Sequence, residues 1–222
     1  MQKFLSELDF GPGDDSWIDD DSHIFGILCY RDIFKCTQFL LTHLPFQAHL
    51  NFEPVHLADS EGRWNDSQMN KCDWWWNTQD QLPAGATFVP VICASDKTHL
   101  TNFSDHQHAW QLYVTIGNIQ KDICRTPKEW AWILVGLIPC TLNGATNIDE
   151  AWHSLVQTVL SQLGNFDIAG PGLKWDCAVG FQRQCYPLLA ASVGDCPGHV
   201  IVAQVSYCSS PMCEIPQRAV MG

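Results

Sequence analysis

Apolar positions follow two different periods along this chain, and the change of period predicts a mixture of helices and strands. Apolar residues three and four apart predict one helix from Asp32 to Leu44 and another from Asn147 to Leu163. Asp32 is suited to cap the first helix and Pro45 to stop it, and Gly164 ends the second.

Five stretches rich in β-branched and aromatic residues predict strands. In chain order they are Ala86–Ala94, Leu112–Gly117, Trp130–Ile138, Leu173–Val179 and His199–Ser206. The first of them ends at Ser95 and Asp96, and Pro139 closes the third. Phe181–Val193 has a mixed pattern, and we predict a helix there with a break near Pro187. The predicted order of elements in this part of the chain is therefore β-β-β-α-β-α-β.

This order of elements predicts the fold class. Three successive strands favour an antiparallel meander, and strands separated by helices favour parallel additions. The same order occurs in ribonuclease-H-like nucleic-acid enzymes, so we predict an α/β fold with a mixed α+β sheet and a partial ribonuclease-H-like architecture. In that architecture acidic residues lie at the end of the first strand, near the end of the fourth strand and on a later helix.

Composition divides the chain into four predicted parts. Residues 1–31 combine turn-forming residues with a block of acids, so we expect an acidic, disordered tail. Residues 32–84 are predicted as a helix with an irregular segment, residues 85–215 as the core, and residues 216–222 as a second tail.

Charge and hydropathy exclude several classes of function. The chain has 24 acidic and 12 basic side chains, a net charge of −12, which repels phosphate and excludes a stand-alone basic nucleic-acid module. The longest apolar run, Trp130 to Cys140, is about 11 residues, whereas a membrane span needs about 20. The first residues lack the apolar stretch of a secretory signal. We therefore expect no membrane contact, no secretion, a nuclear or cytoplasmic location and reduced thiols at the eleven cysteines.

Asp96 is the first candidate for chemistry. Cleavage of phosphodiesters by two metal ions needs clustered oxygen ligands, and a carboxylate at a strand end suits that role. A single Asp after a strand is also an ordinary turn or capping residue, so both interpretations stay open.

Histidines and cysteines offer weaker metal candidates. His99, His106 and His108 lie close together in the sequence, but no paired Cys or carboxylate accompanies them, which favours a polar loop. Cys208 and Cys213 form one loose pair, whereas zinc sites usually use two close pairs, which favours ordinary thiols.

Trp74, Trp75 and Trp76 are a candidate stacking platform for bases or sugars. Three consecutive aromatic residues cannot share one face of a helix or strand. We therefore expect the middle ring to face away from its neighbours, with core packing and one exposed ring.

Several segments resemble the core of Plavaka-type transposases, which belong to the Kyakuja–Dileera–Zisupton group of fungal DNA transposons. The likeness is most specific from residue 74 to residue 123, which includes Ala94-Ser-Asp-Lys-Thr-His99 and Leu112-Tyr-Val-Thr-Ile-Gly-Asn118. It continues through residues 125–127, 135–139, 177–181, 186–190 and 210–213. The helix from Asp32 to Leu44 resembles one upstream of the family's core.

The sequence departs from the family pattern at several positions. Val179 stands where the family has the Asp of Cys-Ala-Asp-Gly, and Asp176, three residues earlier, would face the opposite side of a strand. The family's cysteine-rich run keeps only Cys213 here, which argues against a zinc site. Family members are several times longer, so we expect a fragment whose later acidic residue is beyond the chain.

The resemblance implies descent from cut-and-paste transposases that use acidic residues and Mg²⁺. It implies that Asp96 is a vestigial first metal ligand and that Val179 marks a lost second carboxylate. It also implies that the first strand and the Leu173–Val179 strand are adjacent and parallel, with Asp96 and Val179 at the same end. We therefore expect a transposon-derived fragment without strand-transfer activity, without a small-molecule substrate and without a cofactor of its own; Mg²⁺ belongs to the intact family. Its expected partners are DNA, bound weakly, and a full-length transposase.

Two other functions remain open at this point. The first is a non-catalytic interaction module that pairs with a full-length transposase or a host protein. The second is an unrelated metal-dependent hydrolase built on His99, His106 and His108.

Overall fold

The computed structural model describes residues 18–20, 28–56, 61, 68–99, 108–139, 148–177, 180–194 and 202. The helices in this part of the chain are α2 (Ile33–Thr42), α3 (Asp73–Gln79), α4 (Lys121–Cys124) and α5 (Ile148–Gly164). Short 3-10 helices are η1 (Leu44–His49), η2 (Met69–Lys71) and η3 (Pro127–Glu129). The strands are β1 (Ile18–Asp20), β2 (Leu28–Tyr30), β3 (Thr87–His99), β4 (His108–Ile116), β5 (Ile133–Pro139), β6 (Leu173–Asp176) and β7 (Gln182–Gly194).

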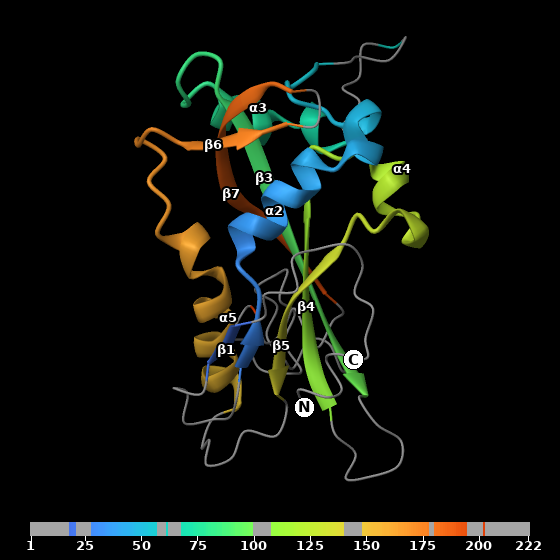
Figure 1. The fold of residues 1–222 in the computed structure, drawn as a ribbon, viewed down its shortest axis with the longest axis vertical. Coiled ribbons are helices and arrows are strands. Elements are labelled where there is room, and N and C mark those ends of the chain that lie inside the picture. The colour runs from blue at the N-terminus through green and yellow to red at the C-terminus, as the bar shows by residue number, and fades with distance from the viewer. Residues whose placement is uncertain are drawn as a thin grey trace, which may run out of the picture.

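The described strands form one mixed seven-stranded sheet in the order β1-β2-β5-β4-β3-β7-β6 (Figure 1). β3, β4 and β5 are antiparallel neighbours, as a meander requires. β7 lies parallel to β3 on the other side, and β6 pairs antiparallel with β7. The α/β class with a mixed sheet, predicted from the sequence, is confirmed.

The two longest helices, α2 and α5, pack against one face of this sheet. That core joins alternate residues of β3 and β4 with the apolar stripes of both helices; among its members are Ile33, Leu40, Val89, Val91, Cys93, Leu112, Val114, Leu155 and Val159. Successive side chains of a strand point to opposite faces, so the even-numbered residues of β3 lie on the other face. There α3 packs near the start of β3, where Trp75 contacts Phe88 with ring centroids 5.4 Å apart.

Both helices predicted by periodicity are present with nearly the expected ends. Asp32 caps α2, because its side chain accepts a hydrogen bond of 3.0 Å from the backbone N–H of Lys35. Pro45 follows α2 within η1, and α5 ends at Gly164. The start and end signals predicted for both helices are therefore confirmed.

The first three strands are present, but their ends differ from the prediction. β3 continues three residues beyond Asp96 to His99. All of β4, which starts at His108, pairs with the second part of β3, and this pairing extends β3 to His99. The third strand starts at Ile133 rather than Trp130, which adopts a left-handed backbone conformation with φ of 54°. Strand length here follows the available pairing partner rather than local composition.

The helix predicted for Phe181–Val193 is wrong, because Gln182–Gly194 form the long strand β7. Cys185 belongs to the core beneath α2 and α5, whereas Tyr186 belongs to the core beneath α3 on the opposite face. Where adjacent residues of a strand are buried on opposite faces, as Cys185 and Tyr186 are, apolar and polar residues do not alternate, so the pattern resembled a broken helix. Pro187 interrupted that pattern without ending the strand.

The predicted strand Leu173–Val179 is shorter and lies elsewhere than expected. Its described part is β6, which pairs with β7 and is not adjacent to β3. Val179 lies outside the described residues, as does most of the predicted strand His199–Ser206, where Val202 alone is described and is helical. Leu28–Tyr30, inside the segment predicted as a tail, form β2 against β5.

Candidate functional site

Asp96 lies near the end of β3 with its side chain exposed, on the sheet face opposite α2 and α5. Its partner across the antiparallel pair is Gln111 of β4. Side chains of such partners are neighbours on the same face of a sheet, so the candidate carboxylate lies beside a carboxamide.

Two hydroxyl groups surround the carboxamide of Gln111. The Tyr113 hydroxyl donates to Gln111 Oε1 at 2.8 Å, and the Thr98 hydroxyl donates to the same oxygen at 3.5 Å. Burial raises the pKa of Tyr113, and the negative charge of Asp96 raises it further, so the phenol stays protonated and remains a donor. Asp96, Thr98, Gln111 and Tyr113 are called the Asp96 cluster below.

The basic residue next to Asp96 in the sequence does not belong to this cluster. Lys97 faces the other side of the sheet, where its Nζ lies 6.0 Å from the ring centroid of Trp110. The cation therefore lies over an aromatic ring of the α5 side. Across β4, the Asp96 carboxylate has the neutral groups of Gln111 and Tyr113 as its neighbours.

The strand that leads to Val179 lies far from Asp96. β6 pairs with the first residues of β7, where Leu173 is opposite Cys185 and Cys185 is opposite Thr87 of β3. Asp96 lies nine residues further along β3, roughly 30 Å for an extended strand. The expectation that the first strand and the Leu173–Val179 strand are parallel neighbours is wrong for the described residues.

β7, and not the Leu173–Val179 strand, is the parallel neighbour of β3. A bulge at Ala190 shifts the register, after which Ala191 is opposite Ile92, Val193 opposite Ala94 and Gly194 opposite Ser95. The pairing ends one residue before Asp96.

The histidine and cysteine candidates do not form a site in the described part of the chain. His99 and His108 are backbone partners at the end of the β3–β4 pair, while His106, Cys196, Cys208 and Cys213 lie outside the described residues. Burial raises the pKa of Cys185 to about 12 and also raises that of Cys177, so both stay protonated thiols. The described residues contain no group of three or more His, Cys, Asp or Glu side chains placed to hold a metal ion.

The tryptophan run behaves as predicted. Trp75 is fully buried in the core beneath α3, and Trp74 remains 40% exposed. Trp76 stacks on His56 with ring centroids 4.4 Å apart and the two planes parallel within 1°. Core packing with one exposed ring is confirmed for this helix.

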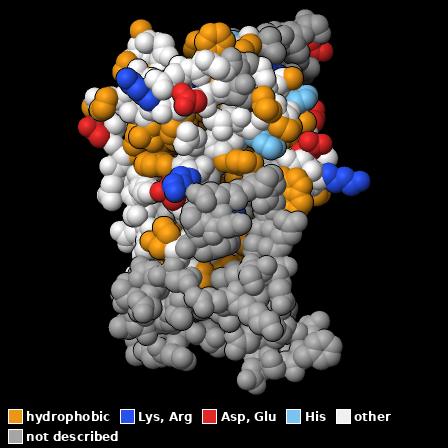
Figure 2. Space-filling model, viewed as in Figure 1, with side chains coloured by type: hydrophobic (Ala, Val, Ile, Leu, Met, Phe, Trp, Pro, Cys, Tyr) orange, Lys and Arg blue, Asp and Glu red, His pale blue; other side chains and the backbone are white. Residues whose placement is uncertain are grey.

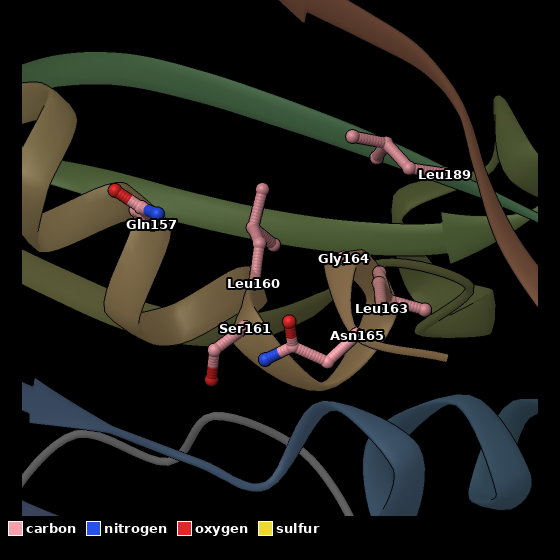
Figure 3. Close-up of a pocket in the computed structure, with 7 residues that line it drawn as sticks. All are labelled: Gln157, Leu160, Ser161, Leu163, Gly164, Asn165 and Leu189. Atoms are coloured by element: carbon pink, nitrogen blue, oxygen red, sulfur yellow. The ribbon is translucent and has the colours of Figure 1, made fainter. Parts of the chain in front are cut away.

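Away from the Asp96 cluster, the described part of the molecule has a hollow and a surface of mixed charge. A hollow of about 310 Å³ lies between α5 and β7 and is lined by Gln157, Leu160, Ser161, Leu163, Gly164, Asn165 and Leu189 (Figure 3). On the described part of the face drawn in Figure 2, basic and acidic side chains are scattered, with no basic patch. Among the described helices, none has the length and apolar character needed to cross a membrane.

Comparison with known proteins agrees with the resemblance of the sequence. The family model described as Plavaka transposase matches residues 15–221, which is nearly the whole chain. No curated protein and no solved structure matches it. With β3, β4 and Asp96 all inside the matched range, this chain belongs to the Plavaka transposase family.

Proposed function

We propose that this chain is a transposase-derived domain with a ribonuclease-H-like sheet in which Asp96 is a vestigial metal ligand. The observation that carries the proposal is the parallel pairing of β3 with β7. The order β5-β4-β3-β7, with three antiparallel strands and a parallel fourth after α5, is the order expected for that architecture.

The side chains named so far do not fit a catalytic metal pair. Two divalent ions need several anionic oxygen ligands each, and the neighbours of Asp96 across β4 are the neutral groups of Gln111 and Tyr113. Val179 stands at the position of the family's Asp. We therefore propose that the chain binds DNA weakly and does not transfer DNA strands by itself.

A DNA cleavage and strand-transfer assay with terminal-repeat DNA in Mg²⁺ or Mn²⁺ tests the proposal. The purified chain should neither cleave nor join this DNA, because the neighbours of Asp96 across β4 are neutral and cannot complete a metal pair. Asp96→Asn should behave as the parent does.

One outcome would contradict the proposal. Cleavage or joining of terminal-repeat DNA by the purified chain, lost in Asp96→Asn, would show that the domain is catalytically active.

An interaction module that pairs with a transposase chain is the second candidate. It is favoured by β7, where Leu189 is 48% exposed and borders the hollow beside α5 (Figure 3). An exposed apolar side chain at the edge of a hollow offers a surface for a protein contact. Light scattering over a range of concentrations tests it, since self-association that is lost in Leu189→Asp supports the module and a monomer at all concentrations opposes it.

A further inference from the structure

β6 is the last strand of the described sheet, so one of its two sides has no neighbouring strand among the described residues (Figure 1). The backbone N–H of Cys177, just after β6, donates to the carbonyl of Phe181 at 2.7 Å. Because backbone groups alternate between the two sides of a strand, the odd-numbered residues of β6 bond to β7. The N–H and C=O groups of Lys174 and Asp176 therefore point away from β7. This side of the strand is called the β6 edge below.

The side chains of Lys174 and Asp176 are both exposed and lie on the same face, two residues apart. Their partners on β7 are neutral. Gln184 is opposite Lys174, and Gln182 is opposite Asp176, where its Nε2 donates to Asp176 Oδ1 at 3.1 Å. The pairing with β7 therefore places no opposite charge beside either residue. Unpaired backbone groups at such an edge can accept a further strand, and the charges on the edge decide which strand fits.

A second copy of β6 is the strand that these charges fit. In an antiparallel pair of two β6 strands, outward-pointing residues have to lie opposite one another, so Lys174 and Asp176 can be paired in three registers. Two of these registers place Lys174 opposite Lys174 or Asp176 opposite Asp176. The third, centred on Trp175, places each Lys174 opposite the Asp176 of the other copy. Like charges directly opposite destabilise a strand pair and opposite charges stabilise it, so the third register is favoured.

We propose that two copies of this chain associate through their β6 edges in this register, with a two-fold axis at Trp175. Each Lys174 exchanges two backbone hydrogen bonds with the Asp176 opposite it and forms an ion pair with its side chain. We expect a weak, reversible dimer, because a contact between two strands of four residues is small. The inference goes beyond the proposed function and does not depend on it, since it uses no residue of the Asp96 cluster.

Sedimentation equilibrium from micromolar to millimolar protein tests the contact. Physiological ionic strength screens the net charge of −12 on each chain more than it screens adjacent ion pairs. The parent should dimerise. Lys174→Asp and Asp176→Lys should each weaken the dimer about tenfold, because either change converts both cross-strand pairs into like-charge pairs.

An equimolar mixture of Lys174→Asp and Asp176→Lys should dimerise as the parent does. In the mixed dimer the new carboxylate of one chain lies opposite the new ammonium group of the other, and the second pair keeps its original residues. Recovery in the mixture also shows that both variants are folded. Lys128→Asp and Asp80→Lys make the same charge changes at exposed positions outside β6 and should dimerise as the parent does.

Hydrogen exchange in the parent locates the contact without any substitution. The backbone amides of Lys174 and Asp176 should exchange more slowly as the protein concentration rises, because they become hydrogen bonded in the dimer. The amide of Lys128 in η3 should exchange at the same rate at every concentration. Equal rates for Lys174 and Asp176 at all concentrations would overturn the inference.

Three sedimentation results would also overturn it. They are a parent that is monomeric at every concentration, a dimer that is unchanged in both single variants, and a mixture that stays monomeric. Self-association that is lost in Leu189→Asp but kept in the β6 variants would assign the contact to the hollow beside α5 and overturn the role of the β6 edge. Strand transfer by the purified chain would overturn the proposed function alone, so the two failures are distinguishable.

Discussion

Buried thiols should make this fold less stable in alkaline solution, and Cys93 on β3 offers the clearest test. Its side chain is 3% exposed, and burial raises its pKa from 9.0 to about 12. In the unfolded chain the thiol loses its proton near 9.0, so above that pH the unfolded state binds fewer protons than the native state. Stability therefore falls as the pH rises from about 9 toward about 12.

The size of the effect follows from the shift in pKa. Each pH unit inside this window changes the free energy of unfolding by about 1.4 kcal/mol per thiol, so Cys93 alone lowers it by about 2 kcal/mol at pH 10.5. Cys185 and Cys36, whose pKa values are raised to about 12 and about 11, mainly by burial, act in the same direction.

Urea unfolding between pH 8 and 10.5, followed by tryptophan fluorescence in a non-thiol reductant, measures this pH dependence of the free energy of unfolding. Cys93→Ala should be less stable at pH 8 but should lose about 2 kcal/mol less than the parent on going to pH 10.5. Val91→Ala is the control, because the side chain of Val91 is buried on the same face of β3 and has no ionisable group. Its difference from the parent should be constant with pH. Parallel pH profiles for Cys93→Ala and the parent would refute the reasoning.

Two further substitutions probe elements predicted from the sequence. Trp75→Ala should destabilise the fold by about 3–5 kcal/mol, because the ring is fully buried, whereas Trp74→Ala should cost much less; equal losses in urea unfolding would contradict the packing. Asp32→Ala should cost about 1 kcal/mol in the same assay, because it removes the cap bond to the backbone of Lys35, and Asp32→Asn should recover most of that loss.

Local signals in the sequence determined much of the secondary structure. The apolar stripes and end signals of α2 and α5 were sufficient because a helix makes its hydrogen bonds within its own segment. Core packing with one exposed ring was expected for Trp74–Trp76, but the packing of α3 on β3 decided that Trp75 is the buried ring. The segments around Asp96 and Leu112 indicated the family that residues 15–221 match.

Strand neighbours were decided only by the tertiary structure. A strand completes its hydrogen bonds with residues far away in the sequence, so nothing local to Leu173–Asp176 showed that it pairs with β7 rather than with β3. The expectation that the Leu173–Val179 strand lies beside β3 is therefore wrong for the described residues.

β7 shows why the sequence misled at this point. Cys185 and Tyr186 enter two different cores on opposite faces of the sheet, so the segment has no alternation to mark it as a strand. Its bulge at Ala190 also moves every later side chain by one register position. Which residues of β7 lie beside residues 92–95 of β3 depends on that one inserted residue, because the pairing across the sheet, and not the sequence of β3, sets the neighbours of its side chains.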